Sequence, residues 1–161
     1  MNDPTEVSHW GPLRLLLAGM DDDIELLYRE ARVEGLKPNW VMELIRLHLR
    51  GPMTITELAE SVERTHSALS QKVAAMRAAG FVATGKGPDG RSKLVLLTPK
   101  AEAVVGRLAA EWRATEEAVA EIEAELPYPL TRVVADIAAL LERKSFHDRI
   151  AEKLADDEAW S

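Results

Sequence analysis

Two short helical patterns followed by a glycine-rich hairpin occupy residues 54–97, and this order of elements constrains the fold more than any other feature of the chain. Thr54 or Thr56 can cap the first of these helices, and Thr54 with Glu57 fits the spacing of a capping box. Thr65 is a suitable N-cap for the second helix. Between two strand-like runs, residues 87–90 supply the glycines and the Asp-Gly step that hairpin turns prefer. The stretch therefore predicts a winged helix-turn-helix.

Apolar residues at helical spacing predict further helices on both sides of this stretch, with prolines and glycines at their ends. The expected fold is mainly α with a small β-wing. We expect a tail at residues 1–10 and a single domain at residues 11–161, with its winged lobe at about residues 38–98. Terminal helices are expected at about residues 12–33 and 99–155, the last of them starting at Leu130 and continuing less regularly to Leu154.

The distribution of charge singles out the same segment. The net charge of −7 at first disfavours a nucleic-acid partner, because phosphates attract basic surfaces. From Arg50 to Arg107, however, nine Lys or Arg stand against five Asp or Glu, so this segment has a net charge of +4 and the rest of the chain −11. The positive charge is concentrated on the predicted winged lobe.

Several classes of protein are disfavoured by what the sequence contains. With no cysteine, the chain has no disulfide, thiolate metal site or thiol redox switch. Its start, Met1-Asn2-Asp3-Pro4, lacks the basic region of a signal peptide, so we expect a cytoplasmic protein without membrane contact. The four histidines lie far apart and no catalytic motif is recognisable. We therefore expect no enzymatic activity, no metal and no cofactor.

The helix after Thr65 carries the candidate recognition residues. If Leu69, Val73 and Met76 face the core, hydrogen-bonding and cationic side chains face outward, with Lys72 near the boundary. Such side chains suit base edges and phosphates in a major groove, although a plain solvated helix face has a similar pattern. The DNA-binding residues predicted on the two helices are Thr54, Thr56, Thr65, His66, Ser67, Ser70, Gln71, Lys72 and Arg77.

The hairpin tip adds a second candidate contact. Arg91, between Lys86 and Lys93, is suited to a minor groove, where narrow A·T-rich segments concentrate negative potential. Asp89 is expected to support the wing by orienting Arg91. An ordinary exposed hairpin is the alternative, in which Asp89 serves the turn and Arg91 serves solubility.

Five short segments together resemble the MarR family of transcriptional regulators: Leu58-Ala59-Glu60, the helix from Thr65 to Ala79, Gly80-Phe81-Val82, Asp89-Gly90-Arg91 and Leu97-Thr98. The resemblance extends from Leu13 to Leu154. Glu63-Arg64 departs from the family pattern, which often has Gly and an apolar residue there; Ser92 replaces a frequent acidic residue, and Ala101 stands where Gly is common.

The resemblance implies a homodimer that binds a pseudo-palindromic operator in double-stranded DNA, with Arg91 of each wing in a minor groove. It also implies a small-molecule effector site between the dimerisation helices and the lobe. Independently, the terminal helices have more apolar surface than one small lobe covers, which favours a two-fold dimer. The residues predicted at that interface are Leu13, Leu16, Leu17, Met20, Val133, Ile137 and Leu140.

The expected function is sequence-specific transcriptional regulation, more often repression than activation. The alternative is a winged-helix module that binds another protein and is indifferent to DNA. Two further assignments stay open. His48 is interpreted as a core histidine rather than the wall of a ligand cavity, and Trp40 and Trp112 fit either plain core or an apolar effector pocket.

Overall fold

The computed structural model describes residues 3–87, 92–155, 157 and 159–160. The chain forms two compact units, residues 1–112 and residues 113–161. Helices dominate, and a small antiparallel sheet of three strands completes the first unit, so the predicted fold class is confirmed.

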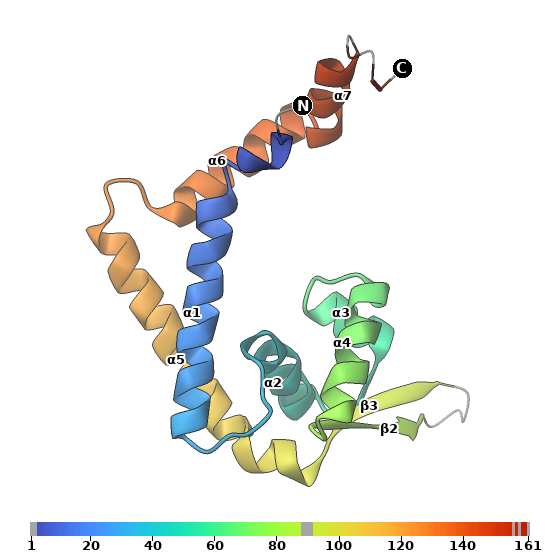
Figure 1. Cartoon of the computed structure of the whole chain (residues 1–161). Helices are drawn as coiled ribbons and strands as arrows, with labels where there is room; N and C mark the ends of the chain where they lie inside the picture. Colours follow the sequence, from blue (N-terminus) through green and yellow to red (C-terminus); the bar gives the residue numbers. More distant parts are fainter. Residues whose placement is uncertain (1–2, 88–91, 156, 158, 161) are drawn as a thin grey trace. The chain divides into compact units, whose positions relative to one another are not determined.

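The first unit contains α1 and the winged lobe (Figure 1). The C-terminal end of α1 meets α5, where the Tyr28 hydroxyl donates to Glu111 Oε2 (2.7 Å) and Arg107 donates to the carbonyl of Ala31 (2.7 Å). The elements are η1 (Pro4–Glu6), α1 (Gly11–Glu30), η2 (Pro38–Trp40), α2 (Val41–Arg50), β1 (Met53–Thr54), α3 (Ile55–Ser61), α4 (His66–Ala78), β2 (Val82–Lys86), β3 (Lys93–Leu97) and the start of α5 (Pro99–Glu125).

The sheet has the order β1-β3-β2, and both pairings are antiparallel. Val95 at its centre lies opposite Met53 of β1 and Thr84 of β2. The hairpin strands lie close to their predicted positions, although β2 begins at Val82 rather than Phe81. Strand β1 was not predicted, because two residues are too few to show an alternating pattern.

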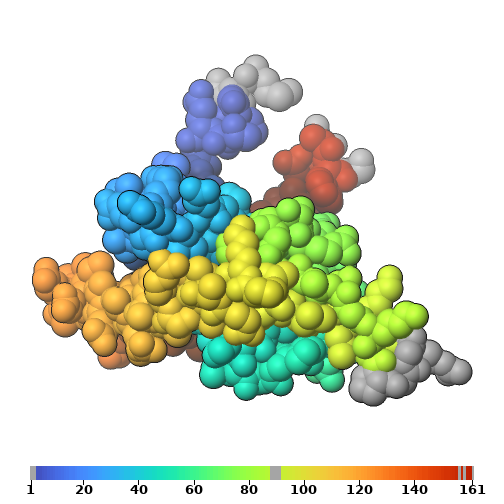
Figure 2. Space-filling view, turned by 90° about the horizontal axis from the view of Figure 1, so that it is seen from below, coloured from blue at the N-terminus to red at the C-terminus, as the bar shows by residue number. Residues whose placement is uncertain are grey.

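The core of the lobe forms where α2, α3, α4 and the sheet meet. Leu69, Val73 and Met76 of α4 are buried there, as the helical spacing predicted. Trp40 packs edge-on against Phe81, with ring centroids 6.1 Å apart, so Trp40 belongs to the core. In Figure 2, the start of α5 (yellow) crosses the visible face of the lobe, with α4 (green) on one side and the α2–α3 region (turquoise) on the other.

Helices α1, α3 and α4 end in the same hydrogen-bonded motif, in which the residue after the C-cap adopts a left-handed backbone. Gly80 has this role after α4 (φ 79°), as the sequence predicted. After α3 the residue is Glu63 (φ 53°), and after α1 it is Arg32 (φ 56°). Both side chains crowd the backbone in a conformation that glycine adopts freely.

The second unit consists of the end of α5 with α6 (Leu130–Arg143) and α7 (Phe146–Leu154). The predicted continuation of one helix from Leu130 to Leu154 is wrong. Lys144 has an extended backbone, and Ser145 starts a new helix by accepting a hydrogen bond from the Asp148 amide (3.0 Å). None of the residues in α6 and α7 is buried within the chain.

Candidate nucleic-acid interface

Helix α4 presents a polar face to the outside of the lobe. Thr65 caps it as predicted, because its hydroxyl accepts a hydrogen bond from the Ala68 amide (3.3 Å). With the apolar face buried, the opposite face is set by helical geometry. Ser67 and Gln71 lie on this opposite face, and His66, Ser70 and Arg77 lie along one flank of it; all are exposed except Ser70, which is half-buried. The outward group predicted from the sequence is therefore brought together on one surface.

The helix before it is held by a complete capping box. Glu57 donates its amide to the Thr54 hydroxyl (3.2 Å), and its carboxylate accepts from the Thr54 amide (2.7 Å) and hydroxyl (2.9 Å). These hydrogen bonds, first that of the backbone and then that of the hydroxyl, lower the pKa of the Glu57 carboxyl. Thr54 is thus the N-cap of α3, while Thr56 lies exposed in its first turn.

Lys72 is turned toward the interior rather than toward the outer face of α4. Its ammonium donates to Glu43 Oε1 and to the carbonyl of Asn39, both at 2.7 Å, and only 20% of its side chain is exposed. The sequence prediction placed Lys72 among the DNA contacts, but its ammonium is already committed to α2 and η2. We therefore leave it out of the proposed DNA contacts.

Sequence reasoning missed the partner of that lysine. Glu43 is 1% exposed and is a charged residue of the described core. The signal was present, because Glu43 lies one helical turn before the buried Leu47 and next to the buried Leu44. An acid on the apolar face of a helix requires a polar partner from another element.

The base of the wing carries two cations. Lys86 and Lys93 lie directly opposite each other at the end of the β2–β3 ladder, and both are exposed. Gly87 continues the hairpin by donating its amide to the carbonyl of Ser92 (2.8 Å). Like charges facing each other repel, so this pair favours an anionic partner such as phosphate. Asp89 and Arg91 lie outside the described residues.

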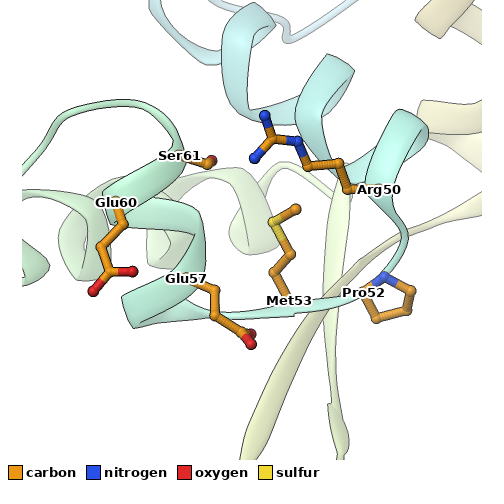
Figure 3. A pocket seen from close by; sticks show the side chains of 6 residues that line it. All are labelled: Arg50, Pro52, Met53, Glu57, Glu60 and Ser61. Carbon is orange, nitrogen blue, oxygen red and sulfur yellow. The ribbon is translucent and has the colours of Figure 1, made fainter.

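A shallow pocket of about 490 Å³ lies between the end of α2 and α3 (Figure 3). In Figure 3 the Arg50 guanidinium lies on the side of Ser61, whereas the carboxylates of Glu57 and Glu60 point away from it. The Glu57 carboxylate already serves the capping box. This mixed lining differs from the largely apolar walls and convergent polar groups that are typical of sites for small molecules.

The other residues considered for an effector cavity have structural contacts. His48 is exposed, and its Nδ1 lies 2.9 Å from Glu102 Oε2, so its interpretation as a core histidine is wrong. Trp112 is partly buried against the core of the first unit.

The residues predicted at a dimer interface leave apolar surface uncovered in each unit. On α1, Leu16 is 60% exposed and Leu17 is also exposed, while Leu13 and Met20 are half-buried. On α6, Val133 and Leu140 are exposed and Ile137 is half-buried.

Within the part of the chain that the structure describes, no helix is long and apolar enough to cross a membrane.

The capped α3–α4 pair and the following hairpin define a winged helix-turn-helix protein. A family model described as HVO_A0114 matches residues 40–104, which include this lobe. The comparison with curated proteins gave no significant match.

Solved structures of similar fold are transcriptional regulators. The Mycobacterium tuberculosis regulator MOSR, in complex with DNA, is 26% identical at a TM-score of 0.55, over 85% of this chain and 96% of that one. Staphylococcus aureus MepR, also in complex with DNA, is 13% identical at a TM-score of 0.60, over 85% and 98%. A MarR protein of Peptoclostridium difficile is 17% identical at a TM-score of 0.56, over 91% and 96%. The chain therefore shares the winged-helix fold of these regulators.

Proposed function

We propose that this protein is a sequence-specific DNA-binding transcriptional regulator that acts as a homodimer on a pseudo-palindromic operator. The observation that carries the proposal is the outer face of α4, where small hydroxyls, an amide and a cation share one exposed surface next to a basic wing. The DNA complexes of MOSR and MepR, which have the same fold, support it.

In the proposed complex, α4 enters the major groove. Gln71 is the residue of this face whose amide can make a bidentate contact to adenine, while His66 and Ser67 in the first turn lie where recognition helices contact bases. Arg77 near the other end of the helix is suited to phosphate. Thr56 and Thr65, near the starts of the two helices, are suited to further phosphate contacts.

The wing completes the proposed contact with the duplex. Lys86 and Lys93 neutralise phosphates beside the groove. Arg91, supported by Asp89, keeps the minor-groove role inferred from the sequence.

Homodimerisation would cover the exposed apolar residues of α1 and α6. Two recognition helices must then reach successive major grooves, about 34 Å apart, which requires an inverted repeat. We infer repression as the mode of action, through occupation of a promoter. We also propose that a small-molecule effector tunes affinity by binding between the dimerisation helices and the lobe, as the resemblance to MarR regulators implies.

The test is a fluorescence-anisotropy titration of the purified protein with its own upstream intergenic DNA and with an unrelated duplex, at several salt concentrations. We expect tight, salt-sensitive preference for the upstream DNA. Gln71→Ala should reduce discrimination at one base position, by about 1–3 kcal/mol for a bidentate contact. Equal losses on every sequence would contradict base readout by Gln71.

A pair of lysine variants separates a specific interface from general electrostatics. Lys86→Ala should lower affinity for all duplexes and reduce the salt slope by about one. Lys153→Ala, an equal change of charge on exposed α7, is the matched control and should bind like the unmodified protein. No binding to either duplex would instead favour a protein-interaction module.

A further inference from the structure

The ion pair between Lys72 and Glu43 joins the proposed recognition helix to the helix behind it. Nζ of Lys72 lies 2.7 Å from Glu43 Oε1 on α2 and 2.7 Å from the carbonyl oxygen of Asn39 in η2. One ammonium therefore connects α4 to two neighbouring elements. Each hydrogen bond has a preferred direction, so together they define where the Lys72 side chain, and the helix that carries it, can lie.

The C-cap of α4 is also held, because Lys100 donates to the carbonyl of Ala79 (2.8 Å), but this hydrogen bond fixes the end of the helix rather than its middle. The contacts of the apolar face with the core do not provide such directional control. Leu69, Val73 and Met76 pack against apolar neighbours, and apolar packing is non-directional. A small rotation of α4 about its axis would keep these side chains buried. The same rotation would displace Gln71, which adjoins Lys72 in sequence and lies on the exposed face.

The environment of Glu43 keeps Lys72 from acting as a DNA contact. Glu43 is 1% exposed, and its second oxygen, Oε2, has no hydrogen-bond partner in the described part of the chain. If the ammonium of Lys72 moved to a phosphate, the buried carboxylate would lose its cation. An uncompensated buried charge is strongly destabilising, so the lysine is held inward.

We propose that Lys72 and Glu43 are positioning residues, which set the rotation of α4 and thereby the sequence specificity of the protein, without contact to DNA. The proposal deepens the proposed function and rests on it. It differs from a phosphate-contact role for Lys72 in a measurable way. A phosphate contact contributes to the salt dependence of binding on every sequence, whereas a positioning pair contributes to discrimination between sequences.

The test compares Lys72→Met, Glu43→Leu and the double variant Lys72→Met/Glu43→Leu, on the operator and on an unrelated duplex at several salt concentrations. Lys72→Met and the double variant, which lack the ammonium, should retain the salt slope of the unmodified protein. All three variants should lower the ratio of specific to nonspecific affinity by about tenfold, comparable to the loss of one base contact. Lys86→Ala is the control, because it should reduce the salt slope and preserve the ratio.

Two results would overturn the proposal. In the first, Lys72→Met reduces the salt slope by about one while Glu43→Leu keeps full specificity, which is the behaviour of a phosphate contact. In the second, the folded double variant retains full specificity, which would limit the pair to a structural role.

Amide hydrogen exchange of the DNA-free protein separates this proposal from the proposed function. We expect Glu43→Leu to accelerate exchange in α4 selectively, since leucine has no acceptor for Lys72 and α4 would lose a directional tether. Unchanged exchange would refute the tether even if the protein binds DNA. If the unmodified protein showed no sequence preference, the proposed function would fail and the specificity role would fail with it, whereas faster exchange would still support the tether.

Discussion

Replacing Lys72 by methionine should destabilise the first unit far more than replacing Glu43 by leucine, although both changes break the same ion pair. Methionine resembles the lysine stem in length but leaves the Glu43 carboxylate, which is 1% exposed, without a cation. Breaking a buried pair in this way costs about 3–5 kcal/mol. Because 20% of the Lys72 side chain remains exposed, some solvent screening applies, and we expect about 3 kcal/mol.

The reverse change should be milder. When Glu43 becomes leucine, the partly exposed Lys72 can extend its ammonium into water, so a loss of about 1 kcal/mol is expected. The double variant Lys72→Met/Glu43→Leu has no buried charge at this site and should lie within about 1 kcal/mol of the unmodified protein. The coupling energy of this double-mutant cycle is then about 4 kcal/mol.

Urea denaturation followed by circular dichroism measures all four proteins. Protein concentration must be equal in every titration, since dimerisation would make apparent stability concentration-dependent. If one m value, the slope of the unfolding free energy against urea concentration, fits all four proteins, the variants differ in stability alone. Equal losses from the two single variants would contradict the asymmetry derived from burial. A loss below about 1 kcal/mol for Lys72→Met would show that water already screens the pair.

Two further changes test the local structure. Glu63→Gly should relieve the left-handed backbone strain after α3, which stabilises the folded protein by about 1 kcal/mol, while the greater freedom of glycine in the unfolded chain costs about 0.5 kcal/mol. A lower free energy of unfolding would refute the strain. Glu60→Gly within α3 should instead destabilise the protein. Burial, followed by the hydrogen bond and charge of Glu111, raises the pKa of the Tyr28 phenol. Because unfolded tyrosine ionises near pH 10, Tyr28 contributes stability that is fully present below about pH 10 and decreases as pH rises toward its folded pKa. Tyr28→Phe should therefore lower stability by about 1 kcal/mol at pH 7, with a difference that shrinks above pH 10. Urea titrations across pH, with exposed Tyr128→Phe as control, measure this; a difference that grows at alkaline pH would contradict it.

Much of the candidate interface was predictable because its determinants are local. The apolar spacing of Leu69, Val73 and Met76 settles which face of α4 is buried, and this places Gln71 on the opposite face. Thr54 and Glu57 interact within one helical turn, so their pairing is visible in the sequence. Hydrogen bonds between near neighbours require little loop closure and little help from the rest of the chain.

Other features depended on partners that are distant along the chain. Strand β1 exists because Met53 and Thr54 meet β3, and two residues have no pattern of their own. The interruption before α7, by contrast, is set locally by the extended backbone of Lys144 and the cap at Ser145, and a broadly helical apolar pattern conceals it.

The sequence by itself determined the winged helix-turn-helix, the cap of each of its two helices and the polar face of α4, because hydrophobic periodicity and capping act over a few residues. Only the tertiary structure decided which way Lys72 points. Helical periodicity placed it at a boundary, where an ammonium can turn outward to solvent or inward to a partner. Glu43, 29 residues earlier in the chain, decides between them, because a buried carboxylate needs a cation and the fold brings this one within hydrogen-bond distance.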